Sequence, residues 1–216
     1  MKIIICLFLF SVVFPSDEKD EISFLYGMLG HLNLPDDKTL VLQDTSIIYT
    51  GDEIKINVGY QRETHFYAIF KGSEGEFDLL YTRYNTLGNS ITALSDTIYT
   101  TALHWTKFND PIGHETFYLI NSIRKQEAIL ALFKHYYKVN EKGKIKLAKK
   151  IQNEIDKINP EKKRDLNSIS SRLAKPVVGG LTFRANNKDE IMDVSLTHSC
   201  KGRAGIAFKT ILLVHK

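Results

Sequence analysis

Residues 53–60 read Glu-Ile-Lys-Ile-Asn-Val-Gly-Tyr, and apolar side chains alternate with polar or small ones along the whole stretch. A period of two is typical of a strand with one face in the core and the other in water. The turn pair Gly51-Asp52 stands directly before the stretch, where a strand is expected to begin. The stretch therefore predicts a strand of a sheet with one wet face.

The chain that follows predicts a central strand and a hairpin. Residues 65–70, His-Phe-Tyr-Ala-Ile-Phe, are apolar on both faces, which is typical of a strand buried on both sides. Residues 72–75, Gly-Ser-Glu-Gly, form a longer loop that leads into another alternating stretch, 77–81. Further short strands are expected around Ile91, at 98–99 and at 115–120.

A helical segment then interrupts the strands. Apolar residues at helical spacing predict one helix within 125–139 and a second over 145–158, which ends before Pro160. A third short helix is expected over 166–173, closed by Pro176. The residues that define the apolar faces of the first two helices are Ile129, Leu132, Phe133 and Tyr136, and then Ile145, Ala148, Ile151, Ile155 and Ile158.

The period returns to two near the C-terminus and predicts strands over 181–185, 192–198 and 206–214, with a hairpin turn at 201–205. Because a terminal group of strands has little core of its own, these strands are expected to join the earlier sheet. The predicted fold class is mainly β, a β-sandwich-like domain with Ig-like sheet packing, and α+β overall. One domain is expected over 39–216, with a helical insertion at about 125–174.

The N-terminus has the features of a secretory signal peptide over 1–16. Lys2 supplies a positive charge, residues 3–14 form an apolar run broken only by a serine, and Pro15-Ser16 precedes a charged segment. Such a run spans about 18 Å as a helix, less than the roughly 30 Å of a bilayer core. Cleavage after Ser16 is favoured, and an uncleaved anchor is the alternative. The protein is therefore expected to be secreted or periplasmic.

Two further expectations concern the segment after the leader and the cysteines. Residues 17–38 are expected to form an N-terminal helical or linker segment, with a short helix over Ile22–Leu34 whose apolar residues recur at helical spacing. Cleavage removes Cys6 and leaves Cys200 as the one cysteine, so no internal disulfide is expected. The mature domain must then be held together by burial of its core.

Composition excludes several broad classes. The chain has 216 residues, of which 43% are hydrophobic and 25% are charged, which argues against wholesale disorder and against a multi-pass membrane protein. A net charge of +4 is too small to argue for nucleic acid by itself. The length fits one compact domain with additions.

Several motifs between residues 40 and 123 occur together in one order and spacing. They are the opening at 49–58, the aromatic strand at 65–70, the loop Ser73-Glu74-Gly75-Glu76, the pair Leu80-Tyr81, Asn85, and the segment 110–120. With these motifs, residues 40–123 resemble a bacterial family called domain of unknown function 4384, although this chain has Tyr81-Thr82 where the family tends to have Phe-Pro. The resemblance implies a β-sandwich-like accessory domain of exported or envelope proteins, often attached to kinase-like or caspase-like modules, and it assigns no activity and no site residues.

Nucleophilic and metal chemistry have little support in the sequence. His198 and Cys200 lie two apart on a predicted strand, without a third group that would orient a catalytic pair. The structural interpretation, a small apolar side chain on the core face, is favoured for Cys200. The seven histidines occur singly, without the spacing of a zinc site, and no cofactor or metal is expected.

A basic stripe is the most informative candidate site. Lysines recur on the side of the second helix opposite its apolar face, and further basic residues follow it. The stripe is either the solvated face of an amphipathic helix or a surface that docks on an anionic polymer, a lipid headgroup or an acidic partner. Its members are Lys146, Lys149, Lys150 and Lys157, followed by Lys162, Lys163 and Arg164.

Trp105 is a second candidate contact. In a long loop it would suit a carbohydrate or peptide, although a single tryptophan in a β-rich domain is more often a core residue.

The function predicted from the sequence is a non-enzymatic binding or assembly module of the bacterial cell envelope. Its expected partner is another envelope protein or an anionic envelope polymer, not nucleic acid, with membrane association only peripheral or through an uncleaved leader. The alternative is a cysteine-dependent hydrolase or thiol oxidoreductase that uses Cys200 and His198.

Overall fold

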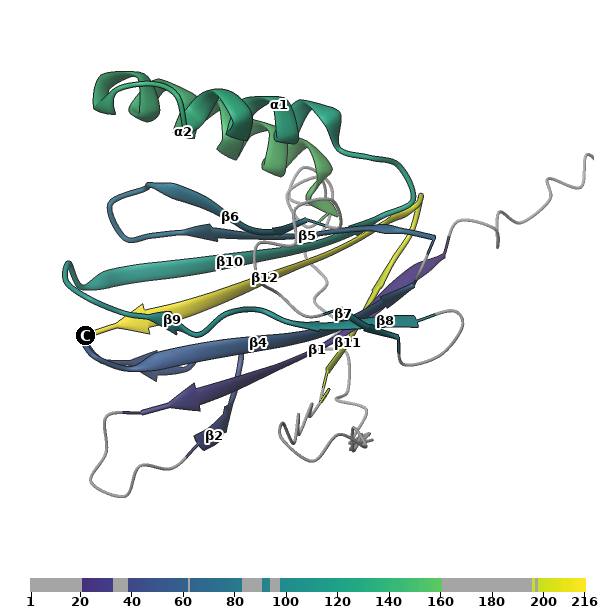
Figure 1. Cartoon of the computed structure of the whole chain (residues 1–216), viewed down its shortest axis with the longest axis horizontal. Helices are drawn as coiled ribbons and strands as arrows, with labels where there is room; N and C mark the ends of the chain where they lie inside the picture. Colours follow the sequence, from purple (N-terminus) through teal and green to yellow (C-terminus); the bar gives the residue numbers. More distant parts are fainter. Residues whose placement is uncertain are drawn as a thin grey trace, which may run out of the picture.

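The chain folds as a β-sandwich with two helices inserted, which confirms the predicted fold class. A computed structural model describes residues 21–32, 39–61, 63–82, 91–93, 98–160, 196 and 198–216. Figure 1 shows two stacked sheets with the helices above them. The predicted signal peptide, the third helix at 166–173 and the strand at 181–185 lie outside the described residues.

Sheet A contains the predicted strand that opens at Glu53. Its strand order is β11-β1-β4-β8-β7, with β2 beside β1 and β9 beside β4. The bounds are β1 Ile22–His31, β2 Thr39–Leu42, β4 Glu53–Gln61, β7 Ile91–Ala93, β8 Ile98–Ala102, β9 Thr106–Lys107 and β11 His198–Gly202.

Sheet B contains the predicted hairpin and the C-terminal strand. Its order is β3-β12-β10-β5-β6, and β5 pairs with β6 through the expected loop. The bounds are β3 Ile47–Ile48, β5 His65–Lys71, β6 Phe77–Thr82, β10 Gly113–Ser122 and β12 Ile206–His215. A tight turn at 203–205 joins β11 of sheet A to β12 of sheet B. The predicted hairpin at 201–205 is therefore wrong, because residues 201–202 belong to β11 and the two strands lie in different sheets.

The alternation in β4 holds on the face that packs toward sheet B. Ile54, Ile56, Val58 and Tyr60 are each at most 2% exposed. The opposite face is less exposed to solvent than predicted, because Asn57 is also buried. β4 lies between β1 on one side and β8 with β9 on the other, so it is an inner strand of its sheet.

The predicted N-terminal helix over Ile22–Leu34 is wrong, because residues 22–31 form strand β1. This strand pairs with β4 from Phe24 opposite Tyr60 to His31 opposite Glu53, and it also pairs with β11 and β2. Its segment alternates as well, and every second residue from Ile22 to Met28 is buried. Pairing on both edges of this segment decides between the helical and the strand period, since a helix here would leave one edge of β4 without a partner strand. The strand is part of the sandwich, not of a separate helical or linker segment.

The helical insertion is confirmed for its first two helices. Helix α1 spans Glu127–Tyr136 and α2 spans Glu141–Ile158. The side chain of Asn140 caps α2 by accepting from the backbone N–H of Gly143, at 3.0 Å. Both helices cover the outer face of sheet B, as Figure 1 shows.

Sheet B is therefore buried on both faces. Phe117 and Leu119 of β10 point into the core between the sheets, while Tyr118 and Ile120 point into a second core beneath the helices. Residues on β5 alternate between the same two cores. The predicted apolar character of 65–70 on both faces is explained by this two-sided cover.

The predicted apolar face of α2 needs one correction. Ile151 and Ile155 are fully buried against sheet B, and Ala148 and Ile158 pack beside them, but Ile145 is 63% exposed. Helical geometry turns Ile145 about 100° or more away from the direction of Ile151. Its side chain therefore lies at the edge of the contact between helix and sheet.

The two isoleucines of α2 give a matched test of the helical layer. We expect Ile155→Ala to lower the free energy of unfolding by about 2–5 kcal/mol, because it opens a cavity in the second core. The same change at exposed Ile145 is expected to stay within about 0.5 kcal/mol. Urea unfolding followed by circular dichroism measures both. Equal effects at the two positions would contradict the packing of α2 on sheet B.

Candidate functional site

The predicted basic stripe lies on the solvent side of α2. Ile151 and Ile155 orient the helix, so the positions opposite to them face water. Lys142, which the sequence-based set omitted, belongs to the same face and lies one helical turn before Lys146. We call this surface the basic face, and it consists of the exposed residues Lys142, Lys146, Lys149, Lys150 and Lys157.

Among the described residues, one lysine of the basic face forms an ion pair and four do not. Lys157 pairs with Glu154 at 2.5 Å. Within the described part of the chain, the other four lysines of the basic face form no ion pair with a carboxylate. Lys142, Lys146 and Lys149 follow one another at about one helical turn, and Lys150 lies beside Lys149, on a helix that is anchored by its own buried residues. The result is a directional positive surface on the outermost layer of the molecule.

Other predicted contact residues do not join this face. Lys162, Lys163 and Arg164 lie outside the described residues. Trp105 lies between β8 and β9 in sheet A, so both sheets separate it from α2.

The interpretation of Trp105 as a core residue is wrong, because it is 40% exposed. Its ring makes an edge contact with His31, and the ammonium of Lys55 lies 5.7 Å from its centroid.

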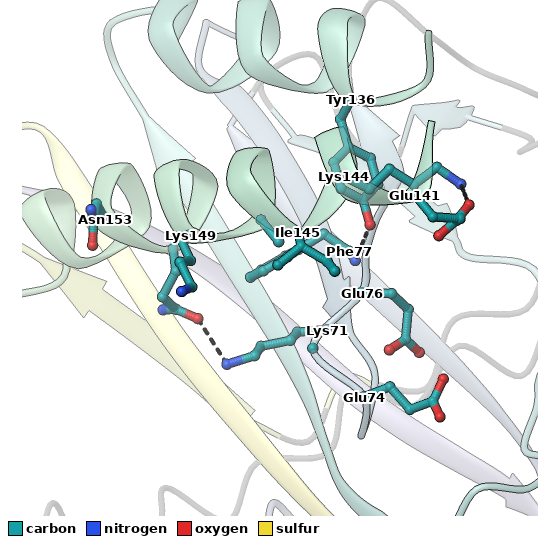
Figure 2. A pocket seen from close by; sticks show the side chains of 13 residues that line it. Lys71, Glu74, Glu76, Phe77, Tyr136, Glu141, Lys144, Ile145, Lys149 and Asn153 are labelled. Carbon is teal, nitrogen blue, oxygen red and sulfur yellow. Dashed lines mark hydrogen bonds and ion pairs between the residues drawn. The ribbon is translucent and has the colours of Figure 1, made fainter. Parts of the chain in front are cut away.

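A groove of about 680 Å³ runs between α2 and the β5–β6 hairpin. Figure 2 shows Ile145 pointing into it from the helix, Lys71 and Lys149 at one end, and Glu74 and Glu76 on the hairpin side. The Nζ of half-buried Lys71 donates to the Oε1 of Gln152 at 3.1 Å. Sequence reasoning missed the groove, because it joins residues from two segments that only the packing brings together.

The hairpin wall of the groove is held by α1. The backbone N–H groups of Phe77 and Leu79 on edge strand β6 donate to the hydroxyls of Tyr136 and Tyr137, at 3.2 and 2.9 Å. The hydroxyl of Tyr137 donates in turn to Asp78 at 2.6 Å. Burial and this carboxylate raise the pKa of Tyr137, so its hydroxyl keeps its proton. These bonds occupy the donors that an added strand would use.

Cys200 and His198 lie on β11 as expected, but they contact other groups. The Cys200 thiol is half-buried against the main core, and its Sγ donates to the backbone oxygen of Phe208 at 3.4 Å. The ring of His198 stacks on Tyr26 with centroids 5.0 Å apart. This packing is consistent with the structural interpretation of the thiol.

A chain of polar groups, Asp110, Thr50, His215 and Glu115, closes one end of the sandwich core. The Thr50 hydroxyl donates to Asp110 at 3.0 Å, and its Oγ1 lies 3.1 Å from the Nε2 of His215. Because the one hydroxyl proton is given to Asp110, Nε2 must donate and does not act as a base toward Thr50. The Nδ1 of His215 is 3.6 Å from the Glu115 carboxylate, too far for a hydrogen bond. The sequence of a hydroxyl, an imidazole and a carboxylate resembles a catalytic triad. The protons are placed differently, because Nε2 of His215 donates to the Thr50 hydroxyl and cannot accept its proton.

Burial raises the pKa of Glu115, and repulsion from Glu76 adds to the shift. His215 and the backbone N–H of Ser73 oppose it without cancelling it.

Two features are absent from the described residues, a metal-binding cluster and a helix that could span a membrane. No group of three or more His, Cys, Asp or Glu side chains among them is placed to hold a metal ion. Neither α1 nor α2 combines the length and the apolar character required to cross a bilayer.

Comparisons with family models, with curated proteins and with solved structures found no match to this chain. The resemblance of residues 40–123 to domain of unknown function 4384 therefore stays a prediction.

The raised pKa of Glu115 predicts a pH-dependent stability. A folded pKa above the ordinary value of 4.5 means that the folded state binds this proton more tightly than the unfolded state. The resulting stabilisation is complete below pH 4.5 and is lost as pH rises through the folded pKa. We expect Glu115→Gln to be more stable than the original chain at pH 8, with the difference vanishing near pH 4. Urea unfolding at both pH values measures this, and exposed Glu74→Gln is the control. A difference independent of pH would contradict it.

The burial of Cys200 predicts slow reaction of its thiol. In a Cys6→Ser background, we expect iodoacetamide to modify Cys200 far more slowly in the native protein than in urea near neutral pH. Mass spectrometry of timed samples measures both rates. Fast native alkylation would instead favour the thiol enzyme that the sequence left as an alternative.

Proposed function

We propose that the protein is an exported binding or assembly module of the bacterial cell envelope that docks on an anionic surface through the basic face of α2. The observation that carries this proposal is the set of four lysines on the outward side of an anchored helix that form no ion pair with any carboxylate of the described residues. Teichoic-type polymers and anionic lipid headgroups share the chemistry that such a face recognises, a row of phosphate or carboxylate groups.

The expected strength follows from the charges. A lysine near an anionic membrane contributes about 1 kcal/mol, so four of them supply about 4 kcal/mol, which corresponds to a dissociation constant of the order of 1 mM. A single copy would therefore bind weakly. It would dissociate as the salt concentration rises, because salt screens the electrostatic attraction. Such a face suits docking on a surface of repeated charges, where several contacts act together.

Export supports this choice of partner. The leader predicted over 1–16 would direct the chain out of the cytoplasm. Outside the cytoplasm, nucleic acid is not the abundant polyanion. Trp105 lies in the other sheet, so it does not belong to the same docking surface.

The proposal is tested by sedimentation with anionic matrices. We expect the protein to pellet with phosphatidylglycerol vesicles or with purified cell-wall material at low salt, and to be released at 0.5 M salt, where the Debye length is only about 4–5 Å. The triple variant Lys146→Glu, Lys149→Glu, Lys150→Glu should remain in the supernatant. The two matrices distinguish a lipid from a wall polymer.

A variant with the same change in net charge serves as the control. Lys107→Glu, Lys201→Glu and Lys216→Glu alter exposed lysines of β9, β11 and the C-terminus, away from α2. This control should pellet as the original chain does. Retention of the α2 variant, or equal loss in both variants, would show that the basic face is only a solvated helix surface.

A further inference from the structure

The groove between α2 and the β5–β6 hairpin has charges of opposite sign at its two sides and an apolar centre. Lys71 and Lys149 lie at one end, and Glu74 and Glu76 extend from the hairpin, as Figure 2 shows. Ile145 points into the space between them. The volume of about 680 Å³ lies within the range of sites that hold small ligands.

Lys71 is the best-defined element of this site. It stands at the end of β5, half-buried beneath α2, with its ammonium 5.8 Å from the centroid of the Phe77 ring. Its hydrogen-bond acceptor is the neutral side-chain oxygen of Gln152. Gln152 is fixed by two further bonds, as it accepts from the Tyr118 hydroxyl at 3.3 Å and donates to Asp156 at 2.9 Å. The described residues thus position the Lys71 charge without giving it an anionic partner.

Ile145 is the second element. It is 63% exposed, whereas the buried isoleucines of the same helix contact sheet B. An isoleucine at the wall of a groove offers apolar contact area to a ligand, which is worth about 25 cal/mol for each Å² that both sides remove from water.

The edge strand excludes one mode of binding. A peptide that extended sheet B beside β6 would need the outward N–H groups of Phe77 and Leu79, which already donate to Tyr136 and Tyr137. A ligand in this groove must therefore be recognised by side chains.

The geometry points to a binding site for a short zwitterionic peptide in this groove. Its carboxylate lies against Lys71 and Lys149, its ammonium group lies against Glu74, and an apolar side chain between them rests on Ile145. The site is separate from the basic face except for Lys149, which borders both. A ligand bound here would add specificity to a domain whose charged surface recognises only a class of polymers.

The test is a titration of the full chain, labelled with ¹⁵N, with peptides that have free ends and a leucine centre. The series Ala-Leu-Ala, Ala-Leu-Leu-Ala and Ala-Leu-Leu-Leu-Ala covers charge separations of roughly 10–18 Å when extended. We expect saturable shifts of the amides of 71–77 and 144–153 for at least one length. Acetylating the amino end or amidating the carboxyl end should each weaken binding about tenfold, as expected for the loss of a charged partner.

Variants separate the groove from the basic face. Lys71→Met keeps the aliphatic contact with Phe77 and removes the charge, so it should weaken peptide binding about tenfold. If Lys71→Met does not fold, exposed Lys149→Met serves the same purpose. Lys146→Gln, on the outer side of the same helix, should bind peptide as the original chain does.

Several outcomes would overturn the inference. Absence of binding by the whole series, unchanged affinity of the capped peptides, or unchanged affinity of Lys71→Met would each do so. Inorganic phosphate is the comparison ligand, because binding as tight as that of the best peptide would reduce the site to a simple anion site. Vesicle or cell-wall retention tests the basic face independently, so either proposal can fail while the other stands.

Discussion

The structure depends on the burial of sheet B on both of its faces. Residues of β5 and β10 alternate between the core shared with sheet A and the core beneath the helices. A sheet that is apolar on both sides cannot leave either side in water without exposing a large apolar patch. Sheet A covers one face, and α1 with α2 cover the other. The inserted helices are thus a required layer of the domain.

This layer determines where the charges lie. Because Ile151 and Ile155 must face sheet B, the helical period places the lysines of α2 on the outermost surface of the protein. The same contact leaves Ile145 at the margin of the interface, opposite the β5–β6 hairpin. The packing of α2 on sheet B therefore places both features, the basic face on the outer side of the helix and the groove at its edge.

Hydrogen bonds from α1 complete the arrangement. Tyr136 and Tyr137 bind the outward N–H groups of β6, which fixes the hairpin relative to the helices. An edge strand with free donors is open to pairing with other chains, and two such donors of β6 are already occupied here. Tyr136 also lines the groove, so the contact that occupies the N–H of Phe77 belongs to the wall of the groove as well.

Local patterns in the sequence determined most elements, namely the alternating strand at 53–60, the hairpin after it, the first two helices and the lysines on the outer side of the second. Local patterns are sufficient for these elements, because each pattern depends only on which side of a single helix or strand faces water. The segment 22–31 fits a helical period and a strand period equally well, and pairing with β4 and β11 decided for the strand. Tertiary structure alone decided the exposure of Ile145 and Trp105, the polar chain from Asp110 to Glu115, and the groove. Each of these features depends on contacts between residues far apart in the chain. The periodicity of one segment carries no information about which other segment packs against it.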